Sequence, residues 1–279
     1  MKYAKKAGYV IATILFLIFT LGPFVWTFIM AVTPKAAMFA PSAKLVPDHI
    51  TWDNFKNLLS GGRRSVTYFT GLKNSMRAVV ITICIGMPVS MMSAYALSRM
   101  EFPGRKLIKN TLLITMVIPV MATIIPLYRM FSAGKLLDNI FWLSAVYVSA
   151  YLPMATWMIT NYLSTIPKEL EEAAKIDGCN AVQTLVKVIV PMLSPAITSI
   201  ALFQFMWSSN DFMGPLLYVN TPAKYPLAIF VKMSMDADSG FQWNRILALS
   251  LISIIPSLVV FFMAQDKFVD GISAGGVKG

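Results

Sequence analysis

The stretch AVVITICIGMPVSMMSAYALS, residues 78–98, runs for 21 residues without an aspartate, glutamate, lysine or arginine. An α-helix of this length, at about 1.5 Å per residue, crosses the roughly 30 Å hydrocarbon core of a bilayer. An ionised side chain at the bilayer centre is costly. A charge-free apolar stretch of this length therefore predicts a transmembrane helix.

Five further charge-free stretches reach a similar length, and they occupy residues 7–34, 110–128, 139–167, 188–210 and 246–265. Charged residues make up 13% of the 279 residues and hydrophobic residues 57%, whereas a soluble globular chain is about 25% charged. The sequence therefore predicts an all-α integral membrane protein with six transmembrane helices. Each span also holds an interior proline that favours a bend, at Pro23, Pro88, Pro119, Pro153, Pro195 and Pro256.

The distribution of lysine and arginine predicts the orientation of these spans. If both termini are cytoplasmic, the inner segments hold 12 of these residues in 51 positions and the outer segments 12 in 88. Positive charge concentrates on the cytoplasmic side of membrane proteins, so we expect both termini to be cytoplasmic. The net charge of +11 is then explained by topology and not by nucleic-acid binding. The first apolar stretch is longer than the roughly 7 to 15 residues of a signal-peptide core, which predicts an uncleaved anchor.

Residues that support catalysis or metal binding are scarce. His49 is the single histidine, and Cys84 and Cys179 are the two cysteines. A membrane-embedded enzyme would need converging titratable groups, and the charge-free spans offer none. No catalytic residue, metal site or resident cofactor is predicted. A phosphate-binding loop of the GxxxxGK[S/T] type is also absent from the sequence, so we do not expect this chain to hydrolyse ATP.

The polar segment between the fourth and fifth spans reads IPKELEEAAKIDGCNAVQTLVKVIVP, residues 166–191. Pro167 suits a first helical turn, the three glutamates that follow favour a helix N-terminus, and Gly178 suits a left-handed helix end. Lys168 with Glu172, and Glu171 with Lys175, have the i, i+4 spacing of surface ion pairs. From these residues alone the helix is either a docking surface for another protein or a solvated connector.

The order Glu172-Ala173-Ala174, Gly178, Val188, Pro191 resembles the EAA motif of the membrane subunits of ABC importers, with valines at 188 and 190 where that family usually has isoleucine and leucine. Three further stretches resemble the maltose-type sugar permeases: AYALSRMEFPGRK at 94–106, WSSNDFMGPL at 207–216 and GISAGGVKG at 271–279. Together these elements extend from the second span to the end of the chain.

This resemblance implies the transmembrane domain of a type I ABC importer. Residues 1–72 would form the first span and an outer loop, residues 73–266 a five-helix core with the EAA loop at 167–191, and residues 267–279 a cytoplasmic tail. The expected partners are a second permease in a heterodimer, two ATPase subunits that hold ATP and magnesium, and an extracytoplasmic sugar-binding protein. The expected location is the cell membrane of a prokaryote. The cargo would be a sugar or oligosaccharide, or alternatively another neutral polar solute, because the spans carry no charge.

The resemblance also implies site residues. ATPase coupling is expected at Glu172, Ala173, Ala174, Asp177, Gly178 and Pro191, and a tail contact with the ATPase at Gly275, Gly276, Val277 and Lys278. Polar and aromatic residues at membrane depth suggest a substrate path at Gln204, Tyr151, Trp157 and Asn210. For Gln204 the alternative is a hydrogen bond between helices, and for the aromatic residues it is packing.

Two features are predicted outside the spans. Trp52, Phe55, Leu58 and Leu59 follow Thr51 with the spacing of a short amphipathic helix capped by that threonine. The outer segment 211–245 contains an apolar run at 225–231 that is too short to span a membrane. We expect the run either to be covered by the binding protein or to pack on the spans.

Overall fold

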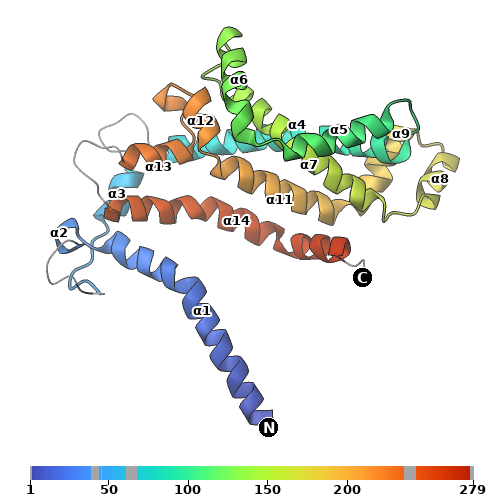
Figure 1. Cartoon of the computed structure of the whole chain (residues 1–279). Helices are drawn as coiled ribbons and strands as arrows, with labels where there is room; N and C mark the ends of the chain where they lie inside the picture. The colour runs from blue at the N-terminus through green and yellow to red at the C-terminus, as the bar shows by residue number, and fades with distance from the viewer. Residues whose placement is uncertain (1, 39–43, 45, 61–67, 236–242, 277–279) are drawn as a thin grey trace. The chain divides into compact units, whose positions relative to one another are not determined.

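The computed structural model describes residues 2–38, 44, 46–60, 68–235 and 243–276, and every regular element in these ranges is a helix (Figure 1). The chain divides into two compact units. One comprises Met1–Phe69 and Ile229–Pro256, and the other comprises Thr70–Ala228 and Ser257–Gly279.

The first unit contains α1 (Lys2–Val32), α2 (Lys35–Met38), α3 (Asp53–Leu59) and parts of α13 (Leu227–Met235) and α14 (Trp243–Gly276). Most of the large apolar side chains along α1 are exposed, Phe16 and Phe19 among them. An apolar surface of this extent is typical of a helix that crosses a membrane.

The predicted amphipathic helix is α3. Its Leu58 is buried, and Trp52, just before it, packs edge-to-face on Phe28 with ring centroids 6.1 Å apart. The predicted threonine cap is displaced by one residue, because Trp52 occupies the N-cap position. The Thr51 hydroxyl instead accepts a hydrogen bond from the Asp53 N–H at 3.2 Å.

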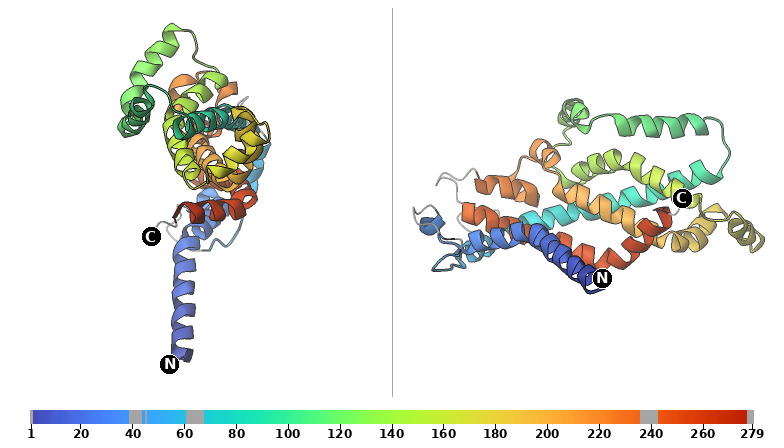
Figure 2. Two further views of the ribbon diagram at one scale, coloured as in Figure 1. Left: turned by 90° about the vertical axis from the view of Figure 1, so that its right-hand side faces the viewer. Right: turned by 60° about the horizontal axis from the view of Figure 1, so that its bottom comes forward.

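The second unit begins with most of α4 (Tyr68–Arg99) and continues through α5 (Arg105–Val117), α6 (Val120–Ala133), α7 (Ile140–Leu163), α8 (Glu169–Ile176) and α9 (Ala181–Thr184). A π-helix, η1 (Leu185–Ile189), leads through α10 (Val190–Met192) into α11 (Ser194–Asn210), followed by α12 (Met213–Tyr218) and the 3-10 turn η2 (Pro222–Lys224). Helices α7 and α11 pack against each other and run side by side in the right view of Figure 2.

Four helices of the described residues are individually long and apolar enough to cross a membrane, within Lys5–Val32, Tyr68–Arg99, Ile140–Leu163 and Trp243–Asp266. Two more candidate spans are bent helix pairs: α5 with α6, at 99°, and Ala181–Met192 with α11, at 82°. If each bent pair is one span, the count is the predicted six.

The two bends coincide with predicted proline positions. Pro119 precedes α6 in an extended conformation and Ile118 is also extended, as expected for a residue before proline. Pro195 lies in the first turn of α11, directly after the second break. The other four prolines lie inside continuous helices. The third and fifth predicted spans are therefore broken, not uniformly helical.

Helix α4 lies at the centre of the packing in this unit. The Ser144 hydroxyl of α7 donates to the Ala78 carbonyl at 3.2 Å, and the Gln204 amide of α11 donates to the Thr82 carbonyl at the same distance. Toward the C-terminal end of α4, a buried apolar cluster joins it to α7, η1 and α11, with Ala94, Ile159, Ile189 and Ile200 among its members. Next to this cluster, Glu171 of α8 contacts Tyr95 and Arg99 of α4.

Candidate functional site

The segment with the EAA motif forms two short helices separated by a sharp turn. Gly178 has φ of +84°, in the left-handed region, as its predicted role as a helix end requires. Beyond it, the Asn180 side chain accepts from the Gln183 N–H and the Gln183 side chain accepts from the Asn180 N–H, both at 2.9 Å. This capping box fixes the start of α9. The spacing Asn-x-x-Gln in the sequence is a signal that could have predicted it.

One face of α8 is buried. Glu171 is 5% exposed and Ala174 6%. The Glu171 Oε1 forms an ion pair with the Arg99 Nε of α4 at 2.6 Å, and the Tyr95 hydroxyl donates to Oε2 at 3.1 Å. The Arg99 Nη2 also donates to the carbonyls of Leu163 and Ile166, at 2.9 and 2.8 Å.

These contacts correct two expectations. Glu171 was assigned by spacing to a surface pair with Lys175, but its ion-pair partner is Arg99, which lies 72 positions earlier in the chain. Ala174 was expected on a smooth docking surface, but its side chain is buried against the chain itself. The physical reason is the same for both, because Glu171 and Ala174 are three residues apart and so share the inward face of the helix.

The opposite face of α8 is exposed and carries Glu172, Ala173 and Asp177. It also carries two apolar side chains that were not predicted to belong to the site: Ile176 is 87% exposed and Leu170 40%. Gly178 and Pro191 are exposed as well, Pro191 one turn before the bend into α11. The missed signal was an isoleucine at the last position of this short helix, next to Asp177 and Gly178.

The backbone of α14 continues into the expected C-terminal tail. The helix ends at Gly276, so Gly275 and Gly276 are its last two residues. Val277 and Lys278 lie outside the described residues.

The four residues expected in a substrate path are not brought together. Gln204 is 2% exposed and lies against Gly86 of α4, which favours the interpretation as a contact between helices. Tyr151 packs on Trp207 with ring centroids 6.2 Å apart. Trp157 and Asn210 are exposed, and the Asn210 amide donates to the Met206 carbonyl of its own helix.

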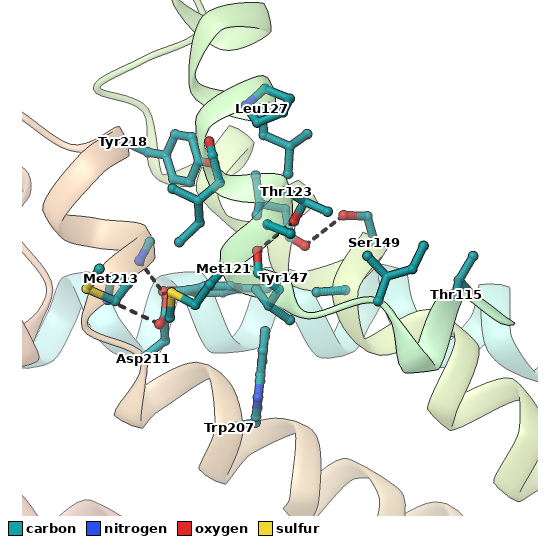
Figure 3. A pocket seen from close by; sticks show the side chains of 18 of the residues that line it. Thr115, Met121, Thr123, Leu127, Tyr147, Ser149, Trp207, Asp211, Met213 and Tyr218 are labelled. Atoms are coloured by element: carbon teal, nitrogen blue, oxygen red, sulfur yellow. Dashed lines mark hydrogen bonds between the residues drawn. The ribbon is translucent and has the colours of Figure 1, made fainter. Parts of the chain in front are cut away.

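A cavity of about 480 Å³ lies between the α5–α6 bend, α7, the end of α11 and α12 (Figure 3). Most of its lining is apolar, and Trp207, Tyr147 and Asp211 lie together on one side. The Asp211 carboxylate accepts hydrogen bonds from the backbone N–H groups of Met213 and Gly214, at 3.2 and 3.0 Å. Asp211 was not predicted to belong to a site, because a charged residue at this position in the sequence indicates only where a span ends.

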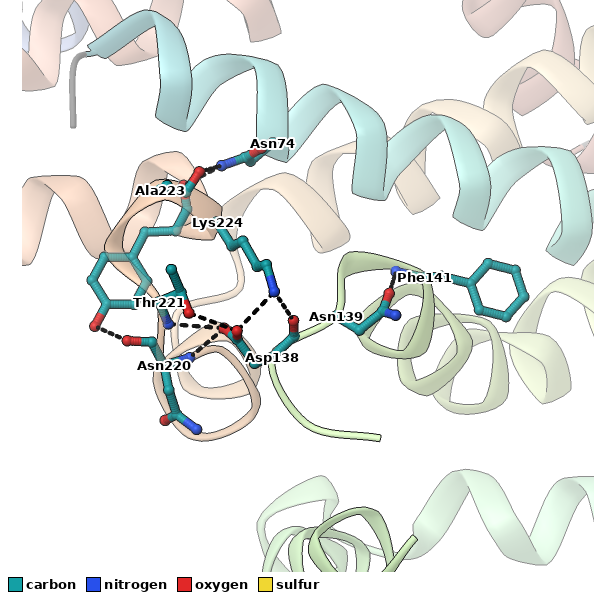
Figure 4. A network of polar contacts seen from close by, with 9 residues as sticks. Asn74, Asp138, Asn139, Phe141, Asn220, Thr221, Ala223 and Lys224 are labelled. Carbon is teal, nitrogen blue, oxygen red and sulfur yellow. Dashed lines mark hydrogen bonds and ion pairs between the residues drawn. The ribbon is translucent and has the colours of Figure 1, made fainter. Parts of the chain in front are cut away.

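The α6–α7 connection and the segment after α12 are joined by a polar network around Asp138 (Figure 4). The Lys224 ammonium donates to both the side-chain and main-chain oxygens of Asp138 at 2.8 Å, and the Thr221 hydroxyl donates to the carboxylate at 2.6 Å. Partial burial raises the pKa of the Asp138 carboxyl. The Lys224 ammonium, the Thr221 hydroxyl and the N–H groups of Thr221 and Asn220 act in the opposite direction and hold the pKa well below its usual range.

The apolar run at 225–231 is covered by the chain itself. Leu227, Ile229 and Phe230 are buried, and the Leu227 N–H donates to the Ser75 hydroxyl of α4 at 2.9 Å. The expectation that this run needs a partner to cover it is therefore wrong, and the alternative, packing within the chain, is confirmed.

The similarity of the chain to known proteins agrees with this architecture. It is 29% identical over 281 residues to the trehalose/maltose transport system permease protein MalG of Thermococcus litoralis, covering 99% of this chain and 98% of the relative. It is 32% identical over 267 residues to the osmoprotective compounds uptake permease protein GgtD of Synechocystis, covering 91% and 88%. A chain in the structure of a bacterial ABC transporter involved in the import of the acidic polysaccharide alginate has the same fold, with a TM-score of 0.80 at 24% identity over 96% of this chain and 98% of that one.

Residues 86–265, from the middle of α4 into α14, match the sequence profile of one transport family. These residues include α8 with its exposed face, the cavity and the Asp138 network. The chain is therefore a membrane transport component and not an enzyme, and it belongs to the family of binding-protein-dependent transport system inner membrane components.

Proposed function

We propose that this chain is one of two permease subunits that form the pathway of an ATP-driven importer for a sugar or oligosaccharide. The relative from Thermococcus litoralis carries the name of a trehalose and maltose system, which supports this cargo. The predicted spans contain no aspartate, glutamate, lysine or arginine, and this suits a solute that is polar but uncharged. A heterodimeric partner permease would cover part of the exposed apolar surface of α1.

The observation that carries the proposal is the exposed face of α8. A side chain such as Ile176 gains about 1.5–3 kcal/mol when it moves from water into an apolar environment. In a solvated connector Ile176 would stay in water, whereas at a docking surface its burial would stabilise the complex. Glu172 and Asp177 beside it provide charge for recognition, and the left-handed turn at Gly178 separates α8 from α9. We therefore assign α8 as the coupling helix that enters an ATPase subunit.

In this proposal the ATPase subunits bind ATP and magnesium, and their closure moves α8 as a rigid body. A binding protein delivers the solute on the opposite side. The topology that follows has α8 and both termini in the cytoplasm and the Asp138 network outside, in the cell membrane of a prokaryote.

The cavity beside Asp211 suits a section of the solute pathway. Small-molecule sites are largely apolar and aromatic, with a few placed polar groups. Trp207 offers an aromatic face, and Asp211 offers a carboxylate already oriented by two backbone donors. Neither residue was among those first expected in the pathway, and Tyr151 connects to this site through its contact with Trp207.

A second candidate cargo is another neutral polar solute. The name of the Synechocystis relative, which refers to osmoprotective compounds, favours it. Uptake by proteoliposomes that contain the complete transporter separates the two cargos, because transport of a radiolabelled disaccharide supports the first and transport of only a small polyol supports the second.

Two variants test the assignment of α8. Ile176→Lys and Glu172→Lys change exposed positions, so each should alter the free energy of unfolding by less than about 0.5 kcal/mol and leave membrane abundance unchanged. At an interface each places a new positive charge, and copurification of the ATPase should fall about tenfold for every 1.4 kcal/mol lost. Glu101→Lys, a charge reversal at an exposed residue outside α8, is the control. Normal copurification and uptake in both α8 variants would reject the assignment.

A further inference from the structure

Buried polar contacts hold helix α4 near each of its ends. The two ends contact two different parts of the chain. Tyr95 and Arg99 bind Glu171 of α8, and Asn74 and Ser75 bind the segment 223–227 that follows α12. Ser75 and Tyr95 are 20 residues apart, which corresponds to about 30 Å along a helix axis, the thickness of the hydrocarbon core. One continuous helix therefore reaches from the coupling helix to a loop at the other side of the membrane.

The inner anchor, the contact of Tyr95 and Arg99 with Glu171, holds α8 in a fixed position relative to α4. The Arg99 and Glu171 side chains are both more than nine-tenths buried, and Arg99 also binds two carbonyls at the end of α7. A buried ion pair has little net advantage in stability over an apolar contact, but loss of one partner leaves an uncompensated charge. The inner end of α4 and α8 can therefore separate only at high cost, and a displacement of α8 is passed to α4.

The outer anchor connects α4 to the Asp138 network. The buried Asn74 amide donates to the carbonyls of Ala223 and Tyr225 at 2.9 and 3.2 Å. These two residues flank Lys224, whose ammonium binds Asp138 (Figure 4). A shift of the outer end of α4 would therefore displace the loop that carries this network.

We propose that α4 transmits the movement of α8 to the outer segment 220–227, so that the ATPase cycle controls the conformation of that segment. This inference rests on the proposed function of α8. The alternative route, along the chain from α8 into α11, passes the π-helix and a bend of 82°. Helix α4 contains Pro88, but its helical backbone runs unbroken from Tyr68 to Arg99, so it is the route without a break.

A cysteine on the outer segment reports the movement directly. The complete transporter is reconstituted with Cys84 and Cys179 replaced by serine and Ala223→Cys introduced, since residue 223 is exposed and contacts Asn74 only through its backbone. The rate of labelling by a membrane-impermeant maleimide is compared with and without a non-hydrolysable ATP analogue. The analogue should change the rate in this background, and Glu171→Gln or Asn74→Ala should reduce that change about fivefold or more.

Glu101→Gln, which removes an exposed carboxylate near the inner end of α4, should retain the full change. If Glu171→Gln lowers membrane abundance, Tyr95→Phe combined with Ser75→Ala removes one hydrogen bond at each anchor, and the same loss is expected. The inference is overturned if labelling never responds to nucleotide, or if the anchor variants keep the full response while the ATPase stays bound. Failure of the ATPase to bind the unsubstituted permease would instead reject the proposed function of α8.

Discussion

Gly86 of α4 lies so close to Gln204 of α11 that a methyl group at position 86 would come within 2.5 Å of the Gln204 Nε2. The same amide donates to the Thr82 carbonyl one turn earlier on α4. The hydrogen bond between the helices is possible because position 86 has no side chain.

Gly86→Ala should therefore destabilise the protein by about 1–3 kcal/mol through overpacking, although alanine is the better helix former. The measurement is the thermal unfolding midpoint of the detergent-solubilised protein. Gly22→Ala in α1 is the matched control, because nothing lies within 4 Å of a methyl group there. Combining Gly86→Ala with Gln204→Ala should recover part of the loss, and a purely additive double variant would contradict the proposed clash.

Substitutions at Gly178 test the effect of backbone strain without the effect of side-chain crowding. A methyl group at this position meets nothing within 4 Å, so the cost of a substitution comes from φ of +84° alone. Gly178→Asn should be tolerated, since asparagine adopts left-handed conformations. Gly178→Val should cost about 1–2 kcal/mol locally and misalign α8. Copurification of the ATPase should fall for valine and persist for asparagine. Equal behaviour of the two variants would show that the aim of α8 does not depend on this turn.

The Asp138 network predicts a sensitivity to acid. Because the pKa of this carboxyl is lowered in the folded state, the unfolded state binds more protons between the folded pKa and the ordinary value of about 3.9. Its stabilising contribution is present above about pH 4 and is lost as the pH falls through the folded pKa. Asp138→Asn should remove this part of the pH dependence, measured as thermal unfolding between about pH 3 and 7. A pH dependence that is the same in Asp138→Asn as in the unsubstituted protein would contradict this role of the network.

Cys179 tests the orientation of the chain. Its side chain is half-buried in the turn between α8 and α9. With Cys84 replaced by serine, a membrane-impermeant maleimide should label Cys179 only after the cells are permeabilised. In a Cys179→Ser background, Ala223→Cys should be labelled in intact cells. Labelling of Cys179 in intact cells would reverse the proposed topology.

The positions of the spans could be predicted from the sequence because the bilayer imposes a rule on each residue separately: charge is excluded from its centre. The two breaks were harder to predict. All six spans contain proline, but only Pro119 and Pro195 lie at a break. In the other four helices the backbone continues through the proline, and the surrounding packing that allows this is not visible in a local pattern.

The candidate site shows a similar division between local and distant information. The turn at Gly178 and the exposure of Glu172 depend on neighbours in sequence, and both were predicted. The partner of Glu171 was not, because Arg99 comes from a helix that the chain leaves long before it reaches α8. Asp211 was missed for another reason, since the rule that located the spans treated every charge as a boundary.

The π-helix η1 marks a place where the inner loop can vary in length. A π-turn holds one residue more than an α-turn, so residues 185–189 amount to an α-helix with a single-residue insertion. The wider turn absorbs the extra residue, so deleting one residue here would restore an α-turn and leave the direction of α8 nearly unchanged. A cysteine at position 176 should then keep its labelling rate. Deleting one residue from α11, which is α-helical, would instead rotate the residues before it by about 100° about the helix axis. Single-residue deletions between related chains should therefore be tolerated within η1 and selected against within α11.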